Sequence, residues 1–424
     1  MSVPTITENG IGTFLFAWEE GIRIEASRLR NHSDGRVTGE LLITTSKPGT
    51  KYPHLHRAQF NFTSTTARDR LAHSLDGRYA KTDWLTILEQ LCVYTLDRIR
   101  QGEPLLNLWQ QDGLYEAPRY LIDPLLVEDY PTVIYGDPGS FKSSIGLYIY
   151  ACLLLPWSDN PLSLGTNLES TKVVYLDWET EPKTTRWQLY RIERGMNLPT
   201  IPLVYRRCGL PLAEDIEAIQ RAIQEAQAKV GIIDSLGLAC GGELKEAAPA
   251  IAFFTALRQL KITSLILAHT AKNPETKHRS IYGSVFFEAQ ARSVWEIKKV
   301  QEVGEDEIDV ALFHRKPPPF QRLHPAIGMN VKFTPDSISI KQQEVKTVRE
   351  FIAALGTQAQ IESLLTHEPL DTKSLMETLG ISRNATDIAL KKLRDKKRII
   401  KLESGKWGLA ANEQNLSHLS GERL

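Results

Sequence analysis

The residues best suited to chemistry lie in the segment YGDPGSFKSS, residues 135–144, between an apolar run and a second apolar stretch. A triphosphate needs backbone N–H groups around its oxygens, a lysine for the β- and γ-phosphates and a hydroxyl for Mg²⁺. Gly136 and Gly139 permit the tight wrap, Lys142 supplies the charge, and Ser143 is placed to hold magnesium. The sequence therefore predicts a binding loop for ATP and Mg²⁺ made of Gly136, Asp137, Pro138, Gly139, Ser140, Phe141, Lys142, Ser143 and Ser144.

Phe141 departs from the Walker A pattern GxxxxGK[ST], which has glycine at this place. A side chain here has to point away from the phosphates if the loop is to bind them. An ordinary strand–helix turn is the plain alternative. The Lys-Ser pair between a strand-like run and a helix-like run favours nucleotide binding.

Two carboxylates follow other apolar runs. Asp234 ends KVGIID and is expected to be the Walker B aspartate, which holds Mg²⁺ through water. Glu179 is expected to end the preceding strand, VVYLDWET. Because parallel strands end at one edge of their sheet, Glu179 is expected near the phosphate loop, where it would polarise the attacking water. The alternative is that Glu179 only caps the end of a strand.

The elements that must position these side chains are visible in the surrounding pattern. Short β-branched runs (PTVIYG, TKVVYLDWE, AKVGIIDSLG and TSLILAHT) alternate with helical segments. This alternation indicates βαβ units and a mostly parallel twisted sheet, an α/β fold. We predict an N-terminal α+β accessory domain over 1–115, an ATPase domain over 120–342, a helical and hairpin domain over 345–410, and a flexible tail over 411–424.

The segments GDPGSFKSS, VVYLDWET, GIIDSLG, LILAHT and HRK resemble the RecA-like ATPase core of hexameric replicative helicases of the RepA and DnaB kind. The resemblance covers about 120–340. It implies that Lys142 and Ser143 bind phosphate and Mg²⁺, that Glu179 is the catalytic base and that Asp234 is the Walker B residue.

The same resemblance assigns roles to three residues near later strand ends. His269 matches the polar sensor that couples the γ-phosphate to the DNA loops. Arg315 and Lys316 match the finger residues that are donated to a neighbouring subunit's site. Taken without the resemblance, His269 is also compatible with a structural histidine, and Arg315 with an ordinary surface arginine.

A long polar loop follows His269 and contains Lys272, Lys277 and Arg279. In the family that the sequence resembles, this loop faces the channel of the ring and binds DNA. Lysine and arginine would there follow the phosphates of single-stranded DNA without reading its bases. The alternative is a solvated loop.

Residues 371–409 predict two short helices and a hairpin. Asp371 and Ser382 are expected helix caps, and Gly380 is expected to end the first helix. This order resembles a winged-helix domain. Between residues 381 and 401 there are eight Lys or Arg against two Asp, which indicates a local DNA-binding patch. Its candidate contact residues are Arg383, Lys391 and Lys392, although winged helices that bind proteins share these elements.

Composition limits the remaining choices. The 424 residues include 51 Lys or Arg and 51 Asp or Glu, for a formal net charge of 0, which excludes a uniformly basic nucleic-acid coat. The four cysteines form no CxxC pair, and the N-terminus has no signal-peptide pattern. No apolar run is long enough for a bilayer span. A cytoplasmic protein without membrane contact is therefore expected.

These observations predict an ATP-hydrolysing DNA motor that forms a homo-oligomeric ring, with a hexamer expected and the ATP site between subunits. A replicative helicase or translocase of phage or plasmid type fits the resemblance. A RecA/RadA-type recombination ATPase and an ATP-switched DNA-binding regulator are the alternatives.

Overall fold

The computed structural model describes residues 2–8, 12–32, 34–46, 53–80, 82–102, 105, 107, 117–270, 281, 283 and 285–410. The chain divides into two compact units. The first contains residues 1–118, 212–227 and 253–261, and the second contains residues 119–211, 228–252 and 262–424.

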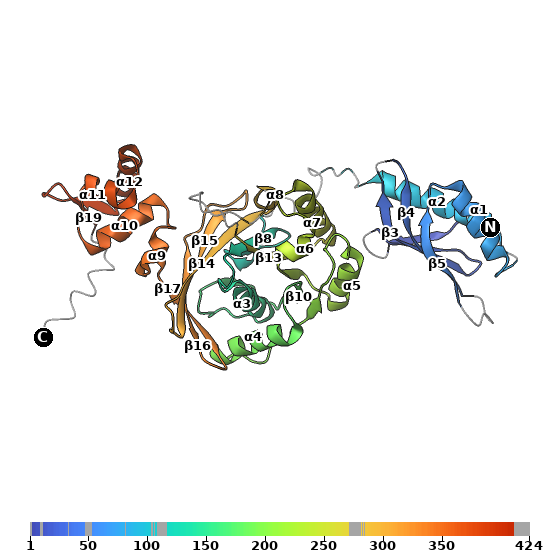
Figure 1. Cartoon of the computed structure of the whole chain (residues 1–424), viewed down its shortest axis with the longest axis horizontal. Coiled ribbons are helices and arrows are strands. Elements are labelled where there is room, and N and C mark those ends of the chain that lie inside the picture. The colour runs from blue at the N-terminus through green and yellow to red at the C-terminus, as the bar shows by residue number, and fades with distance from the viewer. Residues whose placement is uncertain are drawn as a thin grey trace. The chain divides into compact units, whose positions relative to one another are not determined.

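The first unit is built on a five-stranded antiparallel sheet in the order β1-β2-β3-β4-β5 (Figure 1). Alternating residues such as Phe16, Ile24 and Ile43 are fully buried against Leu75 and Leu88 of two helices. The first unit also includes helix α5 (Ile216–Ala226). The bounds are β1 Thr5–Glu8, β2 Phe14–Ala17, β3 Ile22–Asn31, β4 Val37–Thr45, β5 His54–Asn61, α1 Thr65–Asp76 and α2 Trp84–Gln101.

The second unit is organised around a nine-stranded sheet in the order β11-β10-β12-β13-β8-β14-β15-β16-β17. The strands from β11 through β14 in that order are parallel, and β14 through β17 form an antiparallel meander. The expected mostly parallel sheet is therefore confirmed. The bounds are β8 Pro131–Gly136, β10 Val173–Asp177, β11 Tyr205–Arg207, β12 Val230–Asp234, β13 Thr263–His269, β14 Ser293–Val300, β15 Glu307–Lys316, β16 Ile327–Phe333 and β17 Ile338–Gln343.

The register of the parallel strands gathers polar side chains at one edge. Asp177 of β10 pairs with Asp234 of β12, and His269 of β13 pairs with Gly136 of β8. The residues before these positions are buried apolar ones, since a parallel sheet is covered on both faces. The strands' carboxyl ends therefore open on the loop that follows β8.

Helices α3 (Lys142–Leu154) and α4 (Pro182–Gly195) pack against each other on one face of this sheet (Figure 1). Helix α3 is apolar around its whole circumference because it also contacts β6 (Tyr120–Asp123). Helix α6 packs against β12 and β13. The remaining bounds are β7 Leu126–Val127, β9 Gly165–Thr166, α6 Leu236–Cys240, α7 Ala247–Leu260 and α8 Val285–Gln290.

In the C-terminal part of the second unit, helices α10, α11 and α12 and a hairpin pack around Ile361, Leu390 and Trp407. Asp371 Oδ1 accepts a hydrogen bond from Ser374 N (2.8 Å), and Ser382 Oγ accepts one from Ala385 N (3.3 Å), which are the predicted helix caps. The bounds are η2 Val345–Thr347, α9 Arg349–Ile352, α10 Thr357–His367, α11 Thr372–Leu379, α12 Arg383–Asp395, β18 Ile399–Lys401 and β19 Trp407–Leu409.

Among the described residues, none of the helices combines the length and apolar character that crossing a membrane requires.

The last residue of α4, Gly195, lies directly against the backbone of β17. A Cβ atom at this position would lie 2.1 Å from the carbonyl oxygen of Ile338 and 2.3 Å from its carbonyl carbon. Backbone atoms cannot rotate away as a side chain can. Any larger residue at position 195 must therefore push α4 off the edge of the sheet.

We predict that Gly195→Ala lowers the free energy of unfolding of the second unit by about 1–3 kcal/mol, because the added methyl overpacks this contact. Thermal unfolding followed by circular dichroism measures the loss. Gly209→Ala is the matched control, since a Cβ at Gly209 meets no atom within 4 Å. Equal melting temperatures for the two variants would contradict the close contact.

Candidate active site

The loop between β8 and α3 has the backbone shape of a phosphate-binding loop. Gly139 and Phe141 both have positive φ angles, 70° and 76°, which curl the chain before Lys142 begins α3. Gly136 admits no side chain, because a Cβ there would lie 2.6 Å from the carbonyl oxygen of Ile297. The loop therefore places the N-terminus of a 13-residue helix at the edge of the sheet, where anions bind.

Phe141 packs its ring against Phe333 of β16, with the ring centroids 5.9 Å apart and the planes at 88°. This contact accounts for a residue other than glycine at a left-handed position, which costs an L-amino acid about 1–2 kcal/mol.

Lys142 is buried against the backbone of the phosphate loop. Its Nζ donates hydrogen bonds to the carbonyl oxygens of Gly136 (3.0 Å) and Asp137 (2.8 Å). Burial lowers the pKa of Lys142 from its ordinary value, and the carboxylates of Asp234 and Glu179 oppose that shift.

The end of β13 ties the loop to the sheet. Thr270 Oγ1 donates a hydrogen bond to Asp137 Oδ1 (2.5 Å), and Thr270 N donates to the carbonyl oxygen of Gly136 (3.2 Å). Thr270 was not among the residues predicted from the sequence. Its position directly after His269, in the next strand end, was the available signal.

Asp234 is a buried carboxylate at the end of β12, with 2% of its surface exposed. Tyr175 OH donates a hydrogen bond to Asp234 Oδ2 at 2.7 Å. Burial raises the pKa of Asp234, whereas hydrogen bonds from Tyr175 and Ser143 lower it. Asp234 therefore lies beside the hydroxyl of Ser143, and the sequence predicts that these two residues hold Mg²⁺ together.

Glu179 and His269 lie together at the mouth of the site, with Glu179 Oε2 3.7 Å from His269 Nε2. The interaction with His269 lowers the pKa of Glu179, so that Glu179 is ionised at neutral pH. Asp177 Oδ1 accepts hydrogen bonds from the backbone N–H groups of Glu179 and Thr180, both at 2.8 Å. The turn that carries Glu179 is thus held by a buried carboxylate two residues earlier.

A cavity of about 420 Å³ brings most of the predicted residues together. Phosphate-loop residues 139–144 line it with Glu179, Asp234 and His269. The sequence did not predict five other lining residues, which come from α4, from the later strands of the sheet and, for Gln301, from the residue after β14: Gln188, Lys299, Gln301, Ile308 and Phe333. No local motif marks these residues, because they reach the cavity only through the order of the strands.

The polar groups of this site fit a magnesium–nucleotide complex. The first turn of α3 offers backbone N–H groups to phosphates, and Ser143 and Asp234 supply the oxygen ligands that Mg²⁺ prefers. No cluster of three or more His, Cys, Asp or Glu able to hold a metal occurs within the described ranges. Oxygens of Ser143, of water next to Asp234 and of the phosphates would complete the coordination.

Arg315 is bound within its own chain. Its guanidinium donates to Glu296 Oε2, with Nε at 2.9 Å and Nη2 at 2.5 Å, and Nη1 donates to the carbonyl oxygen of Ala354 (3.1 Å). Its Cζ lies 5.0 Å from the centroid of the Phe313 ring. A transfer of this side chain to a neighbouring subunit requires that these bonds break.

Lys316 is likewise bound inside the chain. Its Nζ donates to the carbonyl oxygens of Glu288 (2.7 Å), Ala289 (3.0 Å) and Ala291 (2.8 Å), around the end of α8. A cation at this place complements the negative end of the helix. Neither Arg315 nor Lys316 lines the 420 Å³ cavity of its own chain.

The predicted nucleic-acid residues divide into two groups. Lys272, Lys277 and Arg279 lie outside the described residues. Arg383, Lys391 and Lys392 are exposed on α12, whose Leu390 and Leu393 are buried in the core. These three lie far along the chain from the phosphate loop and form no part of its cavity.

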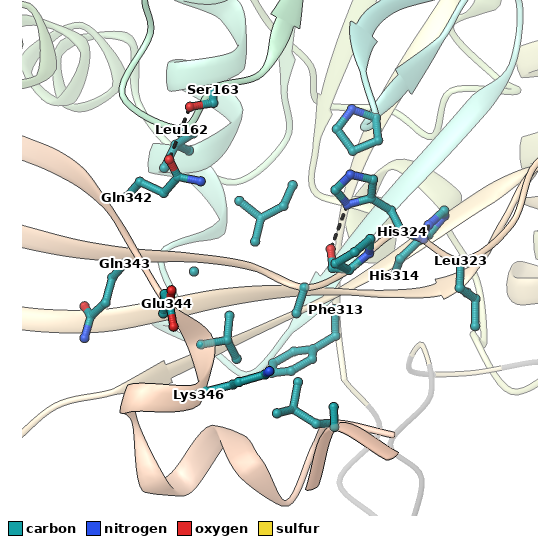
Figure 2. Close-up of a pocket in the computed structure, with 18 of the residues that line it drawn as sticks. Leu162, Ser163, Phe313, His314, Leu323, His324, Gln342, Gln343, Glu344 and Lys346 are labelled. Carbon is teal, nitrogen blue, oxygen red and sulfur yellow. Dashed lines mark hydrogen bonds between the residues drawn. The ribbon is translucent and has the colours of Figure 1, made fainter. Parts of the chain in front are cut away.

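A larger cavity, of about 1320 Å³, lies away from the phosphate loop. Figure 2 shows Phe313, His314, His324 and Gln342 around it, with Ser163 Oγ donating to Gln342 Oε1 at 3.2 Å. None of the predicted site residues lines this cavity. Although this cavity is larger, it is not the candidate active site, because Lys142 and the N–H groups of the phosphate loop line the smaller cavity.

One comparison with known proteins, a family match, covers the residues of the smaller site. Residues 104–275 match the family described as AAA domain, a range that contains the phosphate loop, Glu179, Asp234 and His269. No curated protein matches the chain. A KaiC-like protein of the hyperthermophilic archaeon Pyrococcus horikoshii OT3 is similar at 14% identity over 52% of this chain and 93% of that chain, with a TM-score of 0.35.

The family match and the geometry support a P-loop ATPase core. Lys142 and the loop N–H groups are placed to neutralise phosphates, and Glu179 is placed to orient a water molecule. When bound, Mg²⁺ would withdraw charge from the phosphate oxygens.

We predict that Glu179→Gln keeps nucleotide binding but lowers hydrolysis by about 10²–10⁴-fold, because an amide cannot accept the proton of the attacking water. Phosphate release and nucleotide affinity, measured separately, test this split. Lys142→Ala is the comparison variant and should lose affinity as well. Normal turnover in Glu179→Gln would place the base elsewhere.

Proposed function

We propose that this chain is an ATP-driven DNA motor that assembles into a hexameric ring and works as a replicative helicase or translocase of phage or plasmid type. The proposal is supported by the presence, in one chain, of a candidate hydrolysis site and of a C-terminal segment, residues 381–401, with eight Lys or Arg against two Asp. An ATPase that acts only on small molecules has no need for the second feature.

DNA contact is assigned to the C-terminal helices, which we propose form a winged helix. Helix α12 follows α11 after a three-residue turn in which Gly380 has a φ of 62°, and the hairpin β18–β19 follows α12. Arg383, Lys391 and Lys392 are exposed residues of α12 and would contact DNA phosphates. The basic loop with Lys272, Lys277 and Arg279 is proposed to hold single-stranded DNA in the ring's channel.

The ATP site is proposed to lie between subunits, with His269 as the polar sensor and Arg315 and Lys316 acting on the neighbour's γ-phosphate. Arg315 would then exchange its ion pair with Glu296 for the phosphate of the adjacent site. Glu296 is 5% exposed, and Lys298 also lies beside it, with its Nζ 3.5 Å from Glu296 Oε1. Lys298 would then balance the negative charge of Glu296 when Arg315 moves to the neighbouring subunit.

A second candidate function is favoured by the same contacts. Arg315 and Lys316 are bonded to Glu296, Ala354 and the end of α8 inside their own chain. If these bonds persist in the assembly, no finger reaches the neighbour and hydrolysis stays slow. The chain would then be a DNA-binding regulator whose oligomeric state is switched by ATP.

Unwinding of a forked DNA duplex is the experiment that separates these functions. A helicase separates the strands with ATP but not with a non-hydrolysable analogue, and Lys142→Ala is inactive. DNA retention that depends on ATP, without strand separation, supports the regulator. Filaments instead of closed rings in electron micrographs would support a RecA/RadA-type recombination ATPase.

We predict that Lys391→Ala combined with Lys392→Ala weakens DNA binding and makes it less dependent on salt. Two lost phosphate contacts should reduce the slope of log affinity against log salt by about 2. Fluorescence anisotropy at several salt concentrations measures both effects, and DNA-free ATP hydrolysis should be unchanged. Lys332→Ala combined with Lys341→Ala, on exposed positions of β16 and β17, is the matched control. Equal effects of the two pairs would contradict a DNA site on α12.

We predict that Arg315→Ala removes most ATP hydrolysis, about 10³-fold or more, because a finger stabilises the charge of the transition state. Mixing it with Lys142→Ala should restore part of the activity, since one interface then pairs an intact loop with an intact finger.

Glu296→Gln is the control for the contact of Arg315 in its own chain. It weakens the ion pair but keeps Arg315, so hydrolysis should persist if Arg315 acts on the neighbour. Full activity of Arg315→Ala, or equal losses in both variants, would argue against the interfacial site.

A further inference from the structure

Tyr175 lies in the middle of β10, next to β12, and its side chain is among the fully buried ones. Its hydroxyl donates to Asp234 Oδ2 at 2.7 Å, the short distance of a hydrogen bond to a charged acceptor. A phenol has one hydrogen to donate. Tyr175 therefore donates its only hydroxyl hydrogen to Asp234, the carboxylate that is predicted to hold magnesium.

The ring of Tyr175 is itself held in place. It stacks on Tyr205 of β11, with the ring centroids 6.3 Å apart and the planes at 10°. Tyr205 OH lies within hydrogen-bond distance of the carbonyl oxygen of Thr180 (2.9 Å) and of Asp177 Oδ2 (3.2 Å). The stacked pair thus joins the strand that carries Asp234 to the turn that carries Glu179.

Two further hydrogen bonds restrict the position of Asp234. Its backbone carbonyl oxygen accepts a hydrogen bond from Trp178 N (2.6 Å), and its side chain accepts a hydrogen bond from Ser143. With its hydroxyl on Oδ2, Tyr175 restrains rotation of the carboxylate group about its last bond. Without this bond, the plane of the carboxylate would be free to turn relative to Ser143.

We propose that Tyr175 is a positioning residue that orients Asp234 for the binding of a magnesium–nucleotide complex. This inference rests on the proposed hydrolysis site and adds a residue that touches neither nucleotide nor metal. It acts through the hydrogen bond to Asp234, as outer residues orient the ligands of metal sites.

The test compares Tyr175→Phe with the parent by direct metal binding. Mn²⁺ replaces Mg²⁺, and the free ion is measured by electron paramagnetic resonance in the presence of a non-hydrolysable ATP analogue. We expect Mn²⁺ affinity to fall about tenfold, the lower end of the effect of removing a residue that orients a metal ligand. The affinity for the analogue without metal should stay unchanged, because the phosphate loop is intact.

The kinetic counterpart is a shift in the metal requirement. The Mg²⁺ concentration for half-maximal hydrolysis should rise by a similar factor in Tyr175→Phe. Turnover at saturating Mg²⁺ should remain close to that of the parent. If Tyr175 contributed only to the stability of the fold, Tyr175→Phe would not raise the Mg²⁺ requirement while leaving turnover at saturating Mg²⁺ unchanged.

Tyr150→Phe is the matched control. Tyr150 is also fully buried, and its hydroxyl lies 2.9 Å from both the carbonyl oxygen of Pro202 and the backbone N of Val204. Tyr150→Phe therefore removes a buried hydroxyl, as Tyr175→Phe does, but this hydroxyl makes no contact with Asp234. Its Mn²⁺ affinity should equal that of the parent.

Unchanged Mn²⁺ affinity in Tyr175→Phe, or an equal loss in Tyr150→Phe, would overturn the proposal. A parent that binds the Mn²⁺–analogue complex but neither hydrolyses ATP nor unwinds DNA would overturn the proposed function alone. In that case the tenfold difference would still support Tyr175 as the residue that orients Asp234. A parent that binds no metal–nucleotide complex would overturn both.

Discussion

The burial of the Asp234 carboxylate is the constraint on which the site depends. A charge with 2% exposure is costly to desolvate unless hydrogen bonds and opposite charge compensate it. Tyr175 and Ser143 supply the hydrogen bonds, and Lys142 supplies the nearby positive charge. The parallel register of β10 and β12 brings the Tyr175 ring within reach of Asp234, although it also sets the like charge of Asp177 beside Asp234, which raises the pKa of Asp234. The edge of the sheet is therefore a coupled set of groups, in which one substitution alters the surroundings of several others.

A second coupled set links the sheet to the C-terminal helices. Glu296 lies beside Tyr135, the residue before the phosphate loop, in the register of β14 and β8. Arg315 joins Glu296 to the carbonyl oxygen of Ala354, just after α9, while Lys346 and Arg398 both pair with Glu362 of α10. A movement of Arg315 toward another subunit would therefore also release a contact to the segment that carries the helices. Hydrolysis and the placement of α12 would then be linked through one side chain.

Local patterns were sufficient to predict the strand–loop–helix around Lys142, the strand end at Asp234, and the caps at Asp371 and Ser382, whereas the strand before Glu179 ends two residues earlier, at Asp177. Each of these depends on residues close together in sequence, such as Gly139 three residues before Lys142 or Ser382 directly before a helix. Tyr175, Thr270 and Lys299 were not predicted, because their roles depend on which strands become neighbours. The packing of Phe141 against Phe333 and the ion pair of Arg315 with Glu296 have the same origin. Strand order is a property of the whole sheet, and no short segment encodes it.

The order of strands also bears on how the chain folds during synthesis. Strand β8 lies between β13 and β14, so the chain must extend to Val300 before both of its neighbours exist. Until then α3, which is apolar on all sides, has no complete sheet to cover it, and long-range pairing is slow because large loops must close first. A fragment that ends at residue 275, where the family match ends, contains every residue of the phosphate loop. It nevertheless lacks β14, whose Ile297 closes over Gly136, and would expose one edge of β8 to aggregation.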